Sequence, residues 1–269
     1  MSRRRSTRAA SRHEPYLDST CRPLQSLAFL LPLVAVYEIG LILAHPLLDA
    51  DHLPGLTAQH LLRAFFLIFG ATGYYLPGFV LIALLLVQHA WRRDPWRVQF
   101  RDLPVMAAES LLWAVPLLFV NHAAPLPVLT GGTITGRMVD DILLSIGAGL
   151  YEELVFRLIV MSVVLTMAGD LARWRDRRRG RGRMGMRGYA HSPGLWNSAA
   201  AVAVSALLFS LHHFQPIGLE PFALDDFAFR CLAGIYLSVI FLRRGFGIAV
   251  GAHAAYDVMV VLFAQQGGA

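Results

Sequence analysis

Long apolar segments dominate this chain of 269 residues and decide what it can fold into. A helix needs about 20 consecutive apolar residues to cross a bilayer. Only 16% of the residues are charged, whereas soluble domains carry about 25%. The sequence therefore predicts an all-α protein, a polytopic membrane helical bundle of about seven transmembrane helices, and excludes soluble, disordered and disulfide-scaffold classes. The expected spans are residues 24–46, 60–90, 103–121, 139–169, 195–213, 227–242 and 247–265.

The basic residues lie in short runs between the apolar segments. All 24 are arginine, a usage typical of GC-rich bacterial genes. Arginine-rich runs alternate with arginine-poor connections along the chain, which predicts a bacterial inner-membrane protein with a cytoplasmic N-terminus and an external C-terminus. Such runs face anionic lipid, so the lipid bilayer is an expected partner and nucleic acid is not. The basic runs are the N-terminus, 91–102, 170–188 and 243–244.

These features divide the chain into three parts. Residues 1–23 form a basic cytoplasmic N-terminal segment, 24–122 hold the N-terminal transmembrane helices, and 139–265 form the part in which charged groups recur inside apolar spans. The first apolar stretch is longer than the core of a signal peptide, and no clear cleavage site follows it. We therefore expect it to be retained as a span.

Ionisable side chains inside membrane spans are costly and mark function by default. Glu38 and Glu109 are isolated, and each is open to interpretation as a cap, an interfacial group or a partner across helices. Glu152, Glu153 and Arg157 form the first of three local patterns. Glu153 and Arg157 lie one helical turn apart and are expected to pair. Glu152 points about 100° away around the helix, lacks a local partner and suits general-base work on water. Alternatively, the three residues only form an ion pair that helps the helices to pack and have no catalytic role.

The second pattern ends in two adjacent histidines, His212 and His213. His213 lies four residues after Phe209, one turn away. Because consecutive side chains on a helix point in different directions, at most one of the two histidines is expected near Glu152. We favour His213 and interpret His212 as an interfacial residue.

The third pattern places His253 and Asp257 one turn apart on a later span. A carboxylate at this position can fix the tautomer of the imidazole. Small residues surround His253 and allow another helix to approach closely. A simple hydrogen bond between the two residues is the alternative, but three such patterns on three spans favour a shared site.

In this order the patterns resemble those of the CPBP family, which includes CAAX prenyl endopeptidases of the Ras-converting type and bacteriocin-processing and bacteriocin-immunity proteins. The resemblance covers residues 139–265 and implies a catalytic transmembrane core. It implies an intramembrane endopeptidase that acts on a membrane-anchored protein or peptide. The matching motifs are Glu152-Glu153-x-x-x-Arg157, Phe209-x-x-x-His213 and His253-x-x-x-Asp257.

The resemblance also implies a role for each site residue. Asp257 stands where the prenyl endopeptidases typically have asparagine, so we expect it to orient His253 rather than to donate to an oxyanion. The implied roles are water activation for Glu152 and His213, support for Glu153 and Arg157, and oxyanion stabilisation for His253 and Asp257.

No cofactor is expected. One glutamate and two histidines match the ligands of some catalytic zinc sites, but the sequence lacks a His-Glu-x-x-His motif, which favours glutamate-activated water. A non-enzymatic immunity or scaffolding protein and a proton or ion relay are the alternatives. A relay would spread its charges through the depth of the membrane, whereas a hydrolase would bring them together.

The depths of the histidines set a geometric condition. His213 lies near the outer end of its span, whereas His253 lies roughly 13 Å from the cytoplasmic end of its own. The two can share a site only if the fifth span is short or tilted, or if the loop after it re-enters the membrane. Irregular backbone at that depth is tolerated around a water-filled cavity, which we therefore predict.

Overall fold

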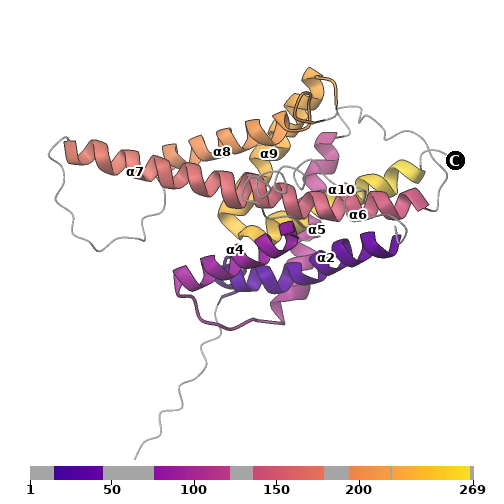
Figure 1. Ribbon diagram of the computed structural model, residues 1–269, viewed down its shortest axis with the longest axis horizontal. Coiled ribbons are helices and arrows are strands. Elements are labelled where there is room, and N and C mark those ends of the chain that lie inside the picture. The colour runs from indigo at the N-terminus through magenta and orange to yellow at the C-terminus, as the bar shows by residue number, and fades with distance from the viewer. Residues whose placement is uncertain (1–14, 45–75, 122–135, 179–193, 219, 267–269) are drawn as a thin grey trace, which may run out of the picture.

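The computed structural model describes residues 15–44, 76–121, 136–178, 194–218 and 220–266. Within these ranges the chain folds into helices and forms no β-sheet, which confirms the predicted all-α bundle (Figure 1). Among the described residues, four helical stretches are long and apolar enough to cross a membrane. They are Pro23–Leu43, Asp102–Val120, Met138–Leu171 and Phe246–Phe263.

The helices follow the predicted spans. Each expected span overlaps a described helix, although residues 60–75 of the second lie outside the described residues. Helices α4 and α8 are shorter apolar helices, and α9 has charged residues in its first and last turns. The count of seven crossings therefore stays a prediction. The helices are α1 (Tyr16–Thr20), α2 (Pro23–Ala44), α4 (Leu76–Arg92), α5 (Asp102–Asn121), α6 (Gly136–Glu153), the π-helical segment η1 (Leu154–Met161), α7 (Ser162–Arg178), α8 (Leu195–Leu211), α9 (Leu224–Arg244) and α10 (Phe246–Gln266).

Helix α10 is the central helix of the bundle and contacts α2, α5, α6 and α9 (Figure 1). Small residues allow these contacts, because two helix backbones approach most closely where the side chains between them are small. A Cβ atom on Gly149 of α6 would lie 2.7 Å from the Cβ of Ala254 and 2.8 Å from the Ala254 nitrogen. A Cβ atom on Gly251 would likewise collide with Ser110 of α5. The positions of α6 and α5 around α10 thus depend on these two glycines.

The two isolated carboxylates of the spans both have partners on other helices, which was one of the alternatives. Glu38 of α2 accepts a hydrogen bond from the hydroxyl of Tyr151 in α6. Glu109 of α5 forms an ion pair with Arg244 at the end of α9, with 2.5 Å between Nε and Oε1. The hydroxyl of Tyr16 in α1 donates a further hydrogen bond of 2.6 Å to Glu109. These contacts join the N-terminal helices to the C-terminal half of the chain.

Three connections meet at one end of the bundle. The guanidinium of Arg92, at the end of α4, donates a hydrogen bond of 3.1 Å to the carbonyl of Cys21, between α1 and α2. The corner between α9 and α10 turns at Gly245, whose φ of 85° favours glycine. A Cβ atom there would lie 2.9 Å from the carbonyl oxygen of Thr20. The α1–α2 turn, the α4 end and the α9–α10 corner therefore lie together, as the arginine pattern predicted for connections on one side.

Replacing Gly149 by valine should destabilise the fold. The added atoms would meet the backbone of α10 rather than a flexible side chain, and overpacking of this kind costs about 1–3 kcal/mol. We expect a lower unfolding temperature for the detergent-solubilised protein than for the wild type. Gly194→Ala is the matched control, because a Cβ atom at Gly194 would meet nothing within 4 Å. Equal unfolding temperatures for Gly149→Val and the wild type would contradict this account of the α6–α10 contact.

Candidate active site

The chain changes helix type directly after its two adjacent glutamates. Helix α6 ends at Glu153, and the next eight residues form η1 before α7 begins. Short π-helical segments within α-helices frequently occur at functional sites. The hydroxyl of Ser205 in α8 donates a hydrogen bond of 2.9 Å to the carbonyl of Phe156 in η1. This bond ties the segment that carries Arg157 to α8.

Glu153 lies between two cationic or hydrogen-bonding side chains. Its Oε1 is 3.0 Å from Nη1 of Arg157 and 2.8 Å from Nδ1 of His253. The side chains of Glu153 and Arg157 are both fully buried. The Arg157 guanidinium also lies over the ring of Phe209 at 4.2 Å and donates to the carbonyl of Gly234 at 3.4 Å. The predicted ion pair is therefore present, and it joins the α6–η1 junction to α8, α9 and α10.

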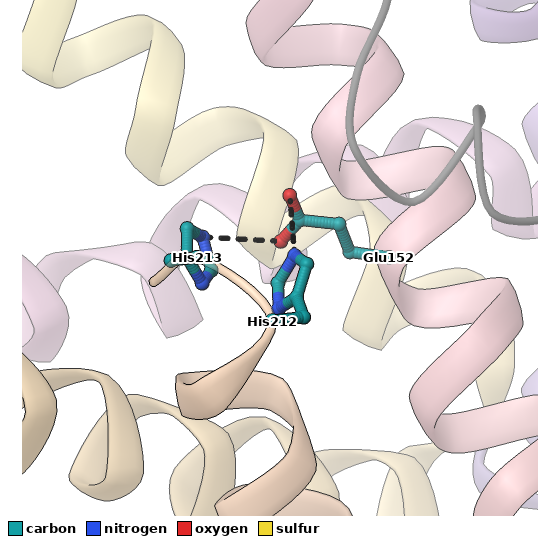
Figure 2. Close-up of side chains that lie close together, drawn as sticks. All are labelled: Glu152, His212 and His213. Atoms are coloured by element: carbon teal, nitrogen blue, oxygen red, sulfur yellow. Dashed lines mark ion pairs between the residues drawn. The ribbon is translucent and has the colours of Figure 1, made fainter. Parts of the chain in front are cut away.

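Glu152 points away from this ion pair and toward three histidines. Its carboxylate oxygens lie 3.5 Å from Nε2 of His212 and 3.9 Å from Nε2 of His213. Figure 2 shows the two histidine rings beside this carboxylate. Nε2 of His253 also lies 3.9 Å from the carboxylate. All three neighbours come from elements distant in sequence. Glu152, His213 and His253 thus converge, which is the proximity that a hydrolytic site requires.

The expectation that at most one of the adjacent histidines lies near Glu152 was wrong. The two rings lie side by side with centroids 3.9 Å apart, and His212 is the more buried, with 4% of its side chain exposed against 22% for His213. The physical reason is that α8 ends at Leu211. The amides of His213 and Phe214 bond to carbonyls three residues earlier, so the backbone tightens into a turn. Side chains in such a turn do not keep the angular spacing of an α-helix.

One backbone carbonyl orients both of these rings. Nδ1 of His212 lies 2.5 Å and Nδ1 of His213 lies 3.0 Å from the carbonyl oxygen of Phe209. A carbonyl oxygen only accepts, so Nδ1 carries the proton in each ring, and Nε2 of the neutral ring carries a lone pair. Both lone pairs face the carboxylate of Glu152, which is also an acceptor. These three groups therefore need a hydrogen-bond donor or a cation between them.

His253 joins the remaining two carboxylates. Its Nδ1 contacts Glu153, and its Nε2 lies 3.3 Å from Oδ2 of Asp257, one turn further along α10. The exposed fraction of the side chain rises from 0% at Glu153 to 22% at His213 and 26% at Asp257. The cluster thus reaches the surface of the described structure beside His213 and Asp257. The water-filled cavity expected there stays a prediction.

The segment after α8 folds back on itself and carries the histidine pair. Phe214 and Glu220 form an isolated β-bridge. Arg230 of α9 closes this turn through an ion pair of 2.7 Å with Glu220. Helix α8 has 17 residues, and the turn after it brings His213 to the carboxylate that His253 also contacts. That α8 crosses the membrane stays a prediction.

Glu152, His212 and His213 are also the residues that could hold a metal ion. Each offers one ligand atom, and these atoms lie within 4.8 Å of one another. A glutamate with two histidines is a ligand set of catalytic zinc sites. The sequence predicts one glutamate and two histidines as possible ligands, but His212 was not expected among them.

Comparison with known proteins identifies the part of the chain that carries this cluster. Residues 134–259 match the family model for type II CAAX prenyl endopeptidases of the Rce1-like kind. This match to residues 134–259 supports a CPBP-family intramembrane protease. The comparisons with curated proteins and with solved structures each found no match.

The CPBP match covers every predicted site residue and also His212. Together with four apolar helices of membrane length, it makes the chain an integral membrane protein and an enzyme of the CAAX-protease type. Helices α2, α4 and α5 lie outside the matched residues. The clustering of the charged side chains also differs from the spread along the membrane normal that a proton relay would need.

Replacing Arg157 by methionine should destabilise the protein strongly. The variant leaves Glu153 buried without its guanidinium, and removal of one partner from a buried ion pair costs about 3–5 kcal/mol. We expect chemical unfolding in detergent to begin at a lower denaturant concentration. The double variant Glu153→Gln/Arg157→Met removes both charges and should recover much of the loss. If Arg157→Met were as stable as the wild type, the Glu153–Arg157 ion pair would not stabilise the α6–η1 junction.

Proposed function

We propose that the chain hydrolyses a peptide bond in a membrane-associated protein or peptide with a water molecule activated by Glu152. The observation that carries this proposal is the cluster of acceptors around that carboxylate. Glu153 contacts Arg157 and His253, whereas Glu152 has no arginine partner among the described residues and faces histidine Nε2 atoms instead. A carboxylate placed in this way is free to accept a proton.

A water molecule satisfies the cluster because it has two hydrogens to donate. With one O–H directed at Glu152 and the other at Nε2 of a histidine, the lone pairs of the water point toward a substrate carbonyl. Glu152 takes the proton as the oxygen attacks, and His213 holds the water in this orientation. The proton on Glu152 then passes to the nitrogen of the leaving amine.

The remaining site residues support this step. Nε2–H of His253, which faces Asp257 at 3.3 Å in the structure, is shared with the oxyanion that forms on the substrate carbonyl. Such preorganised donors are a large contribution to catalysis. Asp257 orients His253, which agrees with their 3.3 Å contact. Glu153 and Arg157 fix the backbone on which Glu152 lies. The mechanism is of the glutamate type and does not use a cofactor.

The substrate that we propose is a peptide or a membrane-anchored tail. The family description supports an endopeptidase, and the apolar helices support an enzyme of the membrane. All basic residues are arginine, in keeping with a bacterial source. Prenylated proteins are not expected in bacteria, so maturation of a peptide or removal of a C-terminal membrane tail fits best.

Replacing Glu152 by glutamine should abolish most of the activity while the fold survives. The amide cannot accept the proton of water, and general-base catalysis contributes about 10²–10⁴-fold. The rate is measured as cleavage of quenched fluorescent peptides, carrying a lipid anchor, in proteoliposomes. Asp225→Asn, at an exposed carboxylate in the first turn of α9, is the matched control and should keep full activity. Unchanged cleavage by Glu152→Gln would exclude Glu152 as the base.

We also propose that the N-terminus lies in the cytoplasm and the C-terminus outside the inner membrane. Support comes from the contacts that bring the α1–α2 turn, the α4 end and the α9–α10 corner to one end of the bundle. Arginine-rich connections lie on the cytoplasmic side.

Fusions of reporter proteins test this orientation. Alkaline phosphatase fused after residue 269 should be active, and green fluorescent protein fused there should be dark. The reverse is expected for both reporters inserted at residue 185, in the basic 170–188 connection. Bright green fluorescence from the C-terminal fusion would overturn the orientation.

A further inference from the structure

We propose that the cavity where the α1–α2 turn, the α4 end and the α9–α10 corner meet binds the phosphate headgroup of an anionic phospholipid. The cavity has a volume of about 180 Å³ and shares no lining residue with the glutamate–histidine cluster. A volume of this size holds several water molecules and is therefore large enough for a phosphate group. The proposal depends neither on the catalytic mechanism nor on which end of the bundle faces the cytoplasm.

The guanidinium of Arg92 supplies hydrogen-bond donors to the cavity. Its Nη1 donates to the carbonyl of Cys21, which holds the arginine at the cavity wall, and its Nε lies 2.9 Å from Oδ2 of Asp94. A guanidinium has five N–H donors, so these two contacts leave three for a ligand. Gln88, one turn earlier on α4, also lines the cavity and adds the two donors of its amide. Phosphate oxygens accept strong, charge-assisted hydrogen bonds from guanidinium groups.

The charged side chains around the cavity are mainly basic. They lie in or directly beside the segments that form its wall, and Arg244 is left out of the count because Glu109 already pairs with it. A phosphate group lowers the repulsion among neighbouring arginines, whereas a cationic group would add to it. The basic residues are Arg22, Arg92, Arg93 and Arg243, and the acidic ones are Asp18 and Asp94.

This end of the bundle lies at the level of lipid headgroups. Two helices of membrane length begin beside the cavity, at Pro23 and at Phe246. Trp91 and Trp96 of the connection after α4 are exposed at 80% and 64%. Exposed tryptophans are typical of the membrane–water interface. Basic pockets between membrane helices at this level bind the headgroups of anionic lipids.

Apolar side chains extend the cavity wall toward the lipid. Phe241 and Leu242 of α9 line the cavity, and Leu242 is 37% exposed. Val87, next to Gln88 on α4, is 58% exposed. A free phosphate ion gains nothing from such a wall, whereas the glycerol and first acyl carbons of a lipid bury apolar surface against it. The arrangement therefore favours a phospholipid over inorganic phosphate.

Cys21 reports whether the cavity is filled, because it is one of the lining residues. The other cysteine is removed by Cys231→Ser in the full chain, which leaves Cys21 as the one thiol. Burial raises the pKa of the Cys21 thiol, so its alkylation by N-ethylmaleimide is followed in alkaline buffer by mass spectrometry. In lipid nanodiscs, replacing part of the phosphatidylcholine by phosphatidylglycerol should slow this alkylation several-fold, since only unoccupied cavities expose the thiol.

Arg92→Gln should lose most of this protection, because an arginine near an anionic lipid contributes about fivefold to binding. Gln88→Glu keeps the bond between Arg92 and the Cys21 carbonyl, places a negative charge in the cavity and should lose the protection as well. Arg93→Gln, at an exposed residue that does not line the cavity, is the matched control and should keep it. Each variant is compared with itself in phosphatidylcholine alone, so a general effect of membrane charge appears as equal slowing in all of them.

The source of the phosphate group is tested in the same assay. Inorganic phosphate or glycerol phosphate is added to phosphatidylcholine nanodiscs, and failure of both to protect Cys21 supports a lipid ligand. Protection equal to that by phosphatidylglycerol would overturn the lipid and identify a soluble phosphate compound as the ligand. No slowing in the Cys231→Ser protein, or equal slowing in Arg92→Gln and Gln88→Glu, would overturn the site itself.

Discussion

The carboxylate of Glu153 is the interaction on which the geometry of the site depends. It lies within 3.0 Å of Arg157 on its own helix and 2.8 Å of His253 on α10, and it is fully buried. A buried charge is stable only when it is paired and hydrogen-bonded. The helices that carry its partners therefore cannot move apart without leaving a charge uncompensated. This ties α10, the central helix, to the junction that carries Glu152.

Steric packing and electrostatics reinforce each other at this junction. Ala254 follows His253 directly, and its backbone contacts α6 at Gly149, one turn before Glu153. The close approach of the two helices is what lets a histidine on one reach a carboxylate on the other. A larger residue at Gly149 would separate the backbones and lengthen the hydrogen bond between His253 and Glu153 at the same time.

Local spacing predicted what lies on one helix, and it failed where a helix ends. The His253–Asp257 contact spans four residues of α10, and the Glu153–Arg157 contact spans four residues across the junction of α6 and η1. The spacing alone was sufficient to predict both. The place of His212 depends on the turn after Leu211, and Pro216 was the available signal, because helices usually end before a proline. The partners of Glu152 come from α8 and α10, and helix-to-helix contacts of this kind are set by packing over the whole bundle. The length of the apolar segments predicted the spans, because about 20 consecutive apolar residues suffice to cross a bilayer.

The two adjacent glutamates have opposite surroundings, and the mechanism that we propose depends on this difference. Glu153 is held by a guanidinium and an imidazole donor, which makes it a structural anion. Glu152 lies about one hundred degrees around the same helix, and the Phe209 carbonyl turns the histidines beside it into acceptors. Because acceptors alone cannot satisfy one another, the cluster selects a ligand that brings hydrogens or positive charge. In the mechanism that we propose this ligand is water, and the ion pair behind Glu152 fixes the position of the carboxylate that receives it.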